Sequence, residues 1–250
     1  MPSPVVFVTG AGRGVGRAIA RRFAHDGYAV ALTGRSHVHL RDTASDILAS
    51  GAEALALTCD VTERGDVARA VALAEQRLGP IDVLVNNAGI AESAPFVSME
   101  DESWDRTVSV NLTGTYNCMR ALVPGMLERR YGRVINIAST AARMGFPYTA
   151  AYVASKHGVL GLTRAVALEA KGRGVTVNAI CPGWIDTEMT RQSIARIVER
   201  AGRTTEEARG ILEQMNPQGR LIDPEEVAAV AAYLASPAAD AVNGQDLDVT

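Results

Sequence analysis

The sequence predicts one doubly wound α/β domain, with helices on both faces of a seven-stranded parallel sheet and a helical lid near the end of the chain. Its 250 residues fit one large domain of this class. Short runs of Val, Ile, Leu and Ala alternate with longer segments of helical periodicity. Most of the short runs lack polar alternation, which is typical of parallel strands buried on both faces. Since no linker or internal repeat interrupts this pattern, residues 1–250 are predicted to form a single domain.

The alternation places the elements in order along the chain. Strands are expected at Val5–Thr9, Ala29–Thr33, Ala54–Thr58, Ile81–Val85, Val134–Ala138, Val175–Ile180 and Leu247–Val249. Helices are expected at Gly16–His25, Leu40–Ser50, Asp66–Leu78, Leu112–Arg129 and Tyr152–Ala170. A last helix should begin at Asp223-Pro224, an N-cap residue followed by proline at the first helical position. This order favours right-handed β–α–β units.

Residues 183–221 depart from the alternation. Apolar residues recur there at helical spacing in two groups, Ile194, Ile197 and Val198, then Ile211, Leu212 and Met215. We therefore expect two short amphipathic helices that form a lid over a ligand cleft. A solvated excursion of the chain is the alternative.

The composition excludes several classes of protein. Hydrophobic residues make up 47% of the chain and charged residues 21%, which argues against disorder. The 25 basic residues nearly balance the 28 acidic ones, so no nucleic-acid partner is expected. The cysteines, Cys59, Cys118 and Cys181, are far apart and lack metal-binding spacing, so we expect free thiols in a reducing cytoplasm and no metal. Neither a signal peptide nor an apolar run near the roughly 18 residues of a membrane span is evident.

A glycine-rich segment follows the first strand directly and leads into a helix. It reads Thr9-Gly10-Ala11-Gly12-Arg13-Gly14-Val15-Gly16. Glycines let the backbone turn tightly and approach a pyrophosphate, whose charge then lies at the helix N-terminus. An ordinary turn is the alternative, but the position between strand and helix favours a Rossmann-type dinucleotide site.

The end of the second strand predicts which dinucleotide binds. NAD-specific sites place a carboxylate there for the ribose 2′-hydroxyl, whereas this strand ends in Leu32-Thr33-Gly34-Arg35-Ser36. Arg35 is placed to meet a 2′-phosphate, with Arg13 as a second cation, which favours NADP(H). The alternative is that both arginines are solvated, or that Arg35 stacks on the adenine. Neither would then bind a 2′-phosphate, and NAD(H) would be the alternative cofactor.

Polar residues follow the third and fourth strands as well. Asp60-Val61 could accept a hydrogen bond from the adenine amino group. Asn86-Asn87-Ala88-Gly89 could tie neighbouring strand ends together and leave room for the dinucleotide. Either segment alone could be an ordinary turn. Their position at the carboxyl ends of strands is what indicates a nucleotide site.

The segment that follows the fifth strand contains three side chains that together suggest proton-transfer chemistry. Ser139 lies at the end of that strand, and Tyr152 and Lys156 are one helical turn apart on one face. A nearby ammonium lowers the pKa of a tyrosine from about 10, and a serine hydroxyl can hold a carbonyl oxygen beside the phenol. A Tyr/Lys pair alone is usually structural. Beside a nucleotide loop it indicates hydride transfer to a carbonyl group.

These motifs together resemble the short-chain dehydrogenase/reductase family over essentially the whole chain. They are Thr9–Gly16, Asp60, Asn86–Gly89, Asn111, Ser139, Tyr152 with Lys156, and Cys181-Pro182-Gly183. The resemblance implies that Tyr152 is the acid/base, that Ser139 orients the substrate oxygen, and that Lys156 lowers the Tyr152 pKa and holds the nicotinamide ribose. Asn111 would support a water that links Lys156 to solvent. Four residues would border the nicotinamide: Pro182, Gly183, Ile185 and Thr187.

Within that family the chain looks most like bacterial 3-oxoacyl and polyketide ketoreductases. The expected function is NADPH-dependent reduction of a small-molecule ketone, including an acyl-thioester-linked one, to a secondary alcohol. Trp184 is a candidate for an apolar wall of the substrate site. One departure from the aromatic-polyketide reductases is that Ile90–Pro95 lacks their Pro-Gly-Gly run. Two alternatives stay open: an NAD(+)-dependent secondary-alcohol or 3-hydroxyacyl dehydrogenase, and a catalytically silent nucleotide-binding sensor or scaffold.

The helix expected at Tyr152–Ala170 bears on assembly. It is apolar on more than one face, although a helix covered only by the sheet should have a polar outer face. A second subunit would cover the other apolar face. The pattern predicts a homo-oligomer, and the family resemblance implies a tetramer.

Overall fold

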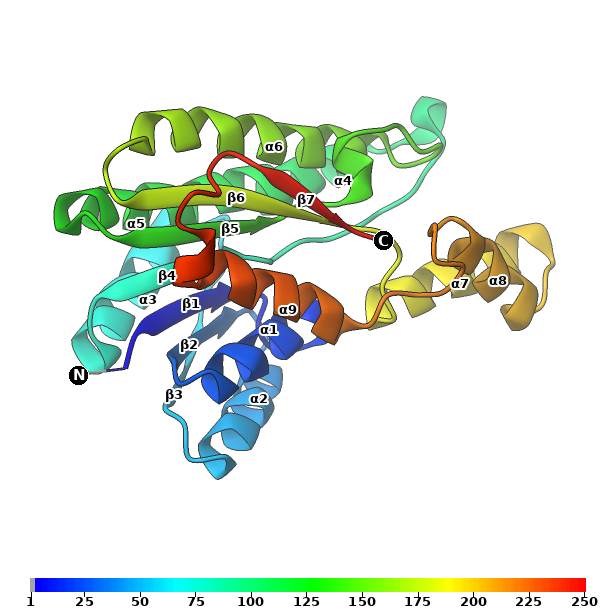
Figure 1. The fold of residues 1–250 in the computed structure, drawn as a ribbon. Helices are drawn as coiled ribbons and strands as arrows, with labels where there is room; N and C mark the ends of the chain where they lie inside the picture. The colour runs from blue at the N-terminus through cyan, green and yellow to red at the C-terminus, as the bar shows by residue number, and fades with distance from the viewer. Residues whose placement is uncertain (1–2) are drawn as a thin grey trace.

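The structure is a computed structural model that describes residues 3–250, which build a seven-stranded sheet in the order β3-β2-β1-β4-β5-β6-β7 (Figure 1). The strands are β1 (Val5–Thr9), β2 (Ala29–Gly34), β3 (Ala54–Thr58), β4 (Ile81–Asn86), β5 (Gly132–Ile137), β6 (Val175–Pro182) and β7 (Asp246–Val249). Every neighbouring pair is parallel, which confirms the predicted doubly wound sheet. The strand order reverses direction between β1 and β4, and this switch point is where such sheets bind ligands.

Helices cover both faces of the sheet (Figure 1). One face carries α1 (Gly14–His25), α2 (His37–Ala49) and α9 (Pro224–Ala235), and the other carries α3 (Arg64–Leu78), α5 (Gly114–Arg129) and α6 (Ala150–Ala170). The remaining helices are α4 (Asp101–Val108), which packs against α6, and the pair α7 (Glu188–Ala201) and α8 (Thr205–Gln214). Single 3₁₀ turns lie at Phe96–Ser98, Thr140–Ala142 and Pro237–Ala239.

The central strand β1 shows why the strands lack polar alternation. Val6 and Val8 pack in the apolar core beneath α1 and α9, while Val5 and Phe7 pack in the core beneath α3 and α5. All four side chains are buried. Because successive side chains of a strand point to opposite faces, a strand covered on both faces needs apolar residues at every position.

Some element boundaries differ from the prediction. α2 begins at His37 and not at Leu40; the three residues before Leu40 are exposed, so the buried apolar face that marks the helix starts only at Leu40. The helices expected at Gly16 and Tyr152 begin two residues earlier, at Gly14 and Ala150. Hydrophobic periodicity marks the buried residues of a helix, so it misses turns that lie in solvent.

The helix expected at Leu112–Arg129 is the second half of a longer helical segment. α4 leads into a π-helical turn at Ser109–Thr113, and α5 follows without a break. The sequence pattern contains little sign of α4, since Thr107 is its only buried residue. Asn111 lies within the wide π turn, a type of turn that is frequent at functional sites.

The segment predicted to form a lid contains the two expected helices, α7 and α8. Their buried residues Ile194, Ala208 and Leu212 pack together with Leu221, and Trp184 packs against this cluster. A capping box formed by Thr204 and Glu207 begins α8. The two amphipathic helices are therefore confirmed, and their action as a lid stays a prediction. No helix within residues 3–250 is long and apolar enough to cross a membrane.

A chain of buried amide and hydroxyl groups crosses the centre of the sheet. Asn86 Nδ2 donates to Asn136 Oδ1 at 2.8 Å, joining the ends of β4 and β5. Asn136 Nδ2 donates in turn to Thr163 Oγ1 of α6 at 2.8 Å. Asn136 is completely buried, so no water can replace these partners. These hydrogen bonds fix α6, which carries Tyr152 and Lys156, over the ends of β4 and β5.

We expect Asn136→Ala to lower the free energy of unfolding by about 3 kcal/mol, because it leaves the Asn86 amide without a partner and opens a cavity in the core. Urea unfolding followed by circular dichroism measures the change. Gln76→Ala on the exposed side of α3 is the control and should alter stability by less than about 0.5 kcal/mol. Equal effects of the two substitutions would contradict a structural role for the Asn136 chain.

Candidate active site

The carboxyl ends of four strands bring the predicted site residues to one edge of the sheet. Gly10 follows β1, Asn87 follows β4, Ser139 follows β5, and Gly183 follows β6. Parallel strands share the same carboxyl edge, so segments far apart in the sequence meet there. The structure thus brings the nucleotide motifs and the candidate catalytic residues together.

Asn87 ties the end of β1 to the end of β4. Its Nδ2 donates to the carbonyl oxygens of Thr9 at 2.9 Å and Gly10 at 3.2 Å. The Thr9 hydroxyl accepts from the backbone N–H groups of Asn87 and Ala88, both at 3.0 Å. The predicted link between strand ends is therefore confirmed, with Asn87 joining β1 to β4 and Asn86 joining β4 to β5.

Two glycines make this close approach possible. Gly10 has φ +65°, and a Cβ there would lie 2.9 Å from Asn87 Nδ2. A Cβ on Gly16 would lie 2.3 Å from the Gly10 carbonyl oxygen, well inside van der Waals contact. Only glycine can occupy these positions without moving the loop, so the glycine pattern has a steric cause.

The start of α1 fits a phosphate group. Arg13 is the N-cap residue, but its side chain bonds no backbone N–H of the helix, and the first turn contains no acidic residue. A helix N-terminus with free N–H donors and no competing carboxylate attracts an anion. Thr187, the N-cap residue of α7, lies close by, with its Cγ2 3.4 Å from the Cβ position of Gly14. The segment after β6 therefore borders the glycine loop, as a dinucleotide that spans both requires.

The residues predicted to meet the adenosine half follow β1, β2 and β3. Arg13 and Arg35 are both exposed, and neither pairs with a carboxylate within residues 3–250. Asp60 Oδ1 accepts from the backbone N–H of Thr62 at 3.0 Å and from its hydroxyl at 2.8 Å. Asn117 of α5 donates to the carbonyl oxygen of Val61 at 2.9 Å, which holds this turn against α5.

Lys156 and Tyr152 project from the first turns of α6 toward the end of β5. Lys156 Nζ donates to the carbonyl oxygen of Ile137 at 2.7 Å and lies 5.7 Å from the centre of the Tyr152 ring. The Ser139 hydroxyl accepts from the backbone N–H of Ala141 at 3.1 Å. The Cβ position of Gly89 is 3.7 Å from Lys156 Nζ, so the ammonium also borders the loop after β4.

Asn111 joins the π turn to that loop. Its Oδ1 accepts from the backbone N–H of Ile90 at 2.9 Å, and its Nδ2 donates to the Ile90 carbonyl at 3.0 Å. The same Nδ2 donates to Ser155 Oγ at 3.1 Å. Asn111 is buried, so these bonds fix its side chain beside Lys156. Ser155 was not predicted as a site residue, and only its place in the Tyr-x-x-x-Lys segment hints at it.

Burial sets the proton affinity of the two central groups. It lowers the pKa of Lys156 to about 8, because no carboxylate compensates the buried ammonium. Burial raises the pKa of the Tyr152 phenol above its usual 10, and the Ser139 hydroxyl opposes this rise. Desolvation thus outweighs the effect of the Ser139 hydroxyl on the Tyr152 pKa, and the expected lowering of this pKa by Lys156 stays a prediction.

The loop that follows Ser139 is held by an ion pair that the sequence did not reveal. Arg143 pairs with Asp246 at 2.6 Å and with Asp248 at 2.7 Å, both in β7. More than a hundred residues separate the partners, so no local pattern could indicate them. Beneath this pair, burial raises the pKa of the Cys181 thiol to about 11.

Trp184 and the lid lie on the other side of the segment after β6. The amide of buried Asn216 binds both the backbone N–H and the carbonyl oxygen of Trp184, each at 2.8 Å. The Trp184 side chain packs on the apolar cluster of the lid, so the predicted substrate wall is anchored there. Its contact with a substrate stays a prediction.

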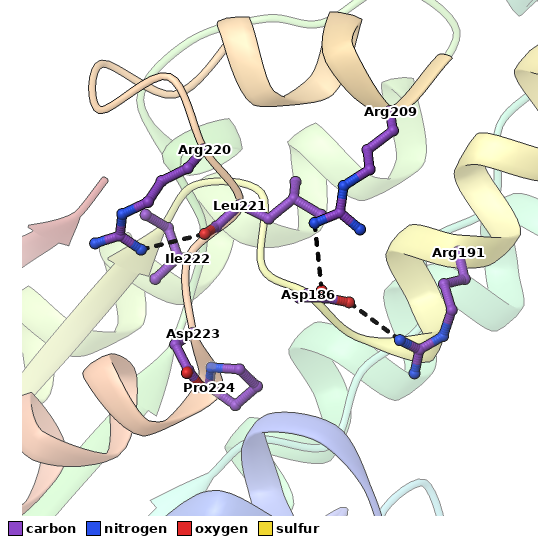
Figure 2. Close-up of a pocket in the computed structure, with 8 residues that line it drawn as sticks. All are labelled: Asp186, Arg191, Arg209, Arg220, Leu221, Ile222, Asp223 and Pro224. Atoms are coloured by element: carbon purple, nitrogen blue, oxygen red, sulfur yellow. Dashed lines mark hydrogen bonds and ion pairs between the residues drawn. The ribbon is translucent and has the colours of Figure 1, made fainter. Parts of the chain in front are cut away.

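A charged pocket of about 390 Å³ lies at the base of the lid, and none of the predicted catalytic residues lines it. Figure 2 shows its lining residues. Within it, Asp186 pairs with Arg191 at 3.0 Å and with Arg209 at 3.5 Å. Arg209 also pairs with Glu213 at 2.8 Å, so both arginines of this pocket that contact Asp186 lie within salt-bridged surroundings. Residues 3–250 contain no cluster of three His, Cys, Asp or Glu side chains placed to hold a metal.

The chain is similar to known reductases over nearly its whole length. A family model described as short chain dehydrogenase matches residues 4–197. A putative ketoacyl reductase of Streptomyces coelicolor is 41% identical over 99% of this chain and 95% of its own length. The 3-oxoacyl-[acyl-carrier-protein] reductase FabG of Staphylococcus epidermidis is 37% identical over 97% of this chain and 95% of its own.

Solved structures give the same result. A variant of actinorhodin polyketide ketoreductase, crystallised with NADPH, superposes with a TM-score of 0.96 at 41% identity, covering 100% of this chain and 97% of that one. Levodione reductase superposes with a TM-score of 0.95 at 34% identity, covering 100% and 96% of the two chains.

The low pKa of Lys156 predicts a specific effect of pH on stability. Unfolding returns Lys156 to its ordinary pKa of 10.5, so the unfolded chain binds more protons than the folded one between pH 8 and 10.5. Relative to Lys156→Met, the unaltered protein should therefore gain about 1–2 kcal/mol of unfolding free energy between pH 7.5 and 9.5. Urea unfolding of both proteins without added nucleotide measures this difference. A gap that does not change with pH would show that the ammonium is not buried.

Proposed function

The chain belongs to the short-chain dehydrogenase family, and on this premise we propose that it reduces the ketone of a 3-oxoacyl or polyketide-like substrate to a secondary alcohol. NADPH is the proposed hydride donor and Tyr152 the proton donor. One observation carries the proposal: Ser139, Tyr152 and Lys156 gather at the sheet edge where the glycine loop begins α1. The relatives named as ketoacyl reductases and the polyketide ketoreductase support the reaction class.

Several groups would hold the dinucleotide. The N-terminus of α1, with Gly14, Val15 and Gly16, would bind the pyrophosphate. Arg13 and Arg35 would bind the 2′-phosphate, and Asp60 and Val61 would meet the adenine. The nicotinamide half would lie among residues of the other strand ends, namely Asn87, Ala88, Gly89, Pro182, Gly183, Ile185 and Thr187. The bound cofactor supplies the hydride.

The chain itself supplies orientation and the proton. The hydroxyls of Ser139 and Tyr152 would both bind the ketone oxygen, which fixes the carbonyl and polarises it. The raised pKa of Tyr152 keeps the phenol protonated near neutral pH, as a proton donor must be. With a pKa of about 8, Lys156 is mostly protonated at pH 7 and would stabilise the tyrosinate that remains.

Asn111 would act on the same site at a distance. Its bonds to Ile90 and Ser155 fix the π turn against the loop after β4, beside the Lys156 ammonium. We propose that this rigid contact supports a water that carries protons between Lys156 and solvent.

The surfaces of the chain support the remaining proposals. Trp184, anchored on the lid, would form one wall for an elongated apolar substrate such as an acyl thioester. Leu168 on the outer face of α6 is 74% exposed, and Tyr116 on α5 is half-exposed. Apolar side chains on these helices favour a second copy of the chain as their cover, and the proposed assembly is a homotetramer.

Tyr152→Phe should reduce kcat for a 3-oxoacyl ketone by at least about 100-fold, because it removes the proton donor and leaves the fold intact. The dissociation constant for NADPH should stay within about twofold, since the phenol makes no contact with the phosphates. Absorbance at the nicotinamide band and fluorescence titration measure the two quantities. Tyr233→Phe, at an exposed position of α9, is the control. A Tyr152→Phe enzyme that retains most of its activity would refute the assignment of Tyr152.

Arg35→Gln should weaken NADPH binding by about tenfold or more, the value of one charge-assisted hydrogen bond to phosphate, and change NADH binding little. Parallel titrations with the two nucleotides measure the ratio. Arg77→Gln on the distant helix α3 should leave both dissociation constants unchanged. If the unaltered protein binds NADH as tightly as NADPH, the direction of the proposed reaction shifts to oxidation of an alcohol with NAD(+).

A further inference from the structure

We infer that Arg17 is a positioning residue that holds the glycine loop in the shape required to bind the pyrophosphate. The inference rests on the proposed function. Arg17 lies in the first turn of α1, and its Nε and Nη2 both donate to the carbonyl oxygen of Gly12, at 3.2 and 2.8 Å. A forked guanidinium on one carbonyl fixes the direction of that peptide group.

The same side chain links the loop to α2. Arg17 Nε also donates to Thr43 Oγ1 at 3.1 Å, and the Thr43 hydroxyl lies 3.5 Å from the Gly12 oxygen. Thr43 is completely buried and donates to the carbonyl of His39 at 3.0 Å. The loop, α1 and α2 thus share one closed network of hydrogen bonds centred on Gly12.

Packing makes the network rigid. A Cβ on Gly12 would lie 2.8 Å from His39 Cβ, so the loop is pressed directly against the first turn of α2. α2 begins two residues after Arg35, the residue assigned to the 2′-phosphate. Arg17 therefore fixes the distance between the two places where phosphates would bind.

The Arg17 guanidinium forms hydrogen bonds within this network and forms no ion pair with a described carboxylate. Within residues 3–250, no carboxylate oxygen lies within ion-pair distance of its guanidinium, and its hydrogen bonds go to neutral oxygens. Arg21, one turn further along α1, provides the contrast. It also contacts α2, through an exposed ion pair with Asp46, but it does not contact the loop.

The test compares nucleotide affinity in five variants: Arg17→Gln, Arg17→Lys, Thr43→Val, the double variant Arg17→Gln/Thr43→Val, and Arg21→Gln. Fluorescence titration with NADPH and NADH gives the dissociation constants, and thermal unfolding confirms that each variant is folded. Arg17→Gln should weaken both nucleotides by about tenfold, because both need the same pyrophosphate loop. Thr43→Val should weaken them less, and the double variant should be no weaker than Arg17→Gln, since both act through Gly12. Arg21→Gln should bind as the unaltered protein does.

Other results would overturn the inference in distinct ways. Unchanged affinity in folded Arg17→Gln would refute it and leave the proposed function standing. Full affinity in Arg17→Lys would assign the effect to charge, because lysine keeps the charge but cannot form the fork. An unaltered protein that binds neither nucleotide would refute the proposed function, and this inference with it. A KM for the ketone that rises in Arg17→Gln while nucleotide affinity is unchanged would also refute it.

Discussion

The contact between Asn87 and the end of β1 is the interaction on which the rest of the site depends. It closes the switch point of the sheet, where β1 and β4 lie side by side and the chain passes from one half of the fold to the other. Without it the glycine loop would lack its support on the β4 side. The contact is possible only because Gly10 and Gly16 have no side chains. The space around the two glycines and the hydrogen bonds of Asn87 therefore specify the same close approach of the loop to β4.

The chemistry of the site follows from how little water reaches α6 and β5. A buried lysine without a carboxylate partner would normally be costly, and its pKa falls accordingly. The carbonyl of Ile137 gives the ammonium one hydrogen bond, at 2.7 Å. The burial that lowers the Lys156 pKa also raises that of Tyr152, because desolvation disfavours the charged form of each group.

Much of the fold and of the site follows from local sequence patterns. Strand β1 is predictable because Val5, Val6, Phe7 and Val8 are all buried, and Tyr152 and Lys156 are predictable as neighbours because they are one helical turn apart. Contacts between distant segments are not predictable in this way. The pair of Arg143 with Asp248, the bond from Lys156 to Ile137 and the rise in the Tyr152 pKa all depend on packing. Helix α4 was missed for a related reason, since its exposed residues carry no apolar period.

The burial of the three thiols gives the protein its own reporters of motion. Cys59, Cys118 and Cys181 are free and buried, and burial raises the pKa of each thiol, so almost none is present as the reactive thiolate at neutral pH. An alkylating reagent can reach them only when the surrounding structure opens. Cys59 and Cys118 lie in the core between the sheet and the helices α3 and α5, whereas Cys181 lies in β6 near the candidate active site. The relative rates of alkylation would therefore distinguish local opening around the catalytic edge from unfolding of the whole domain.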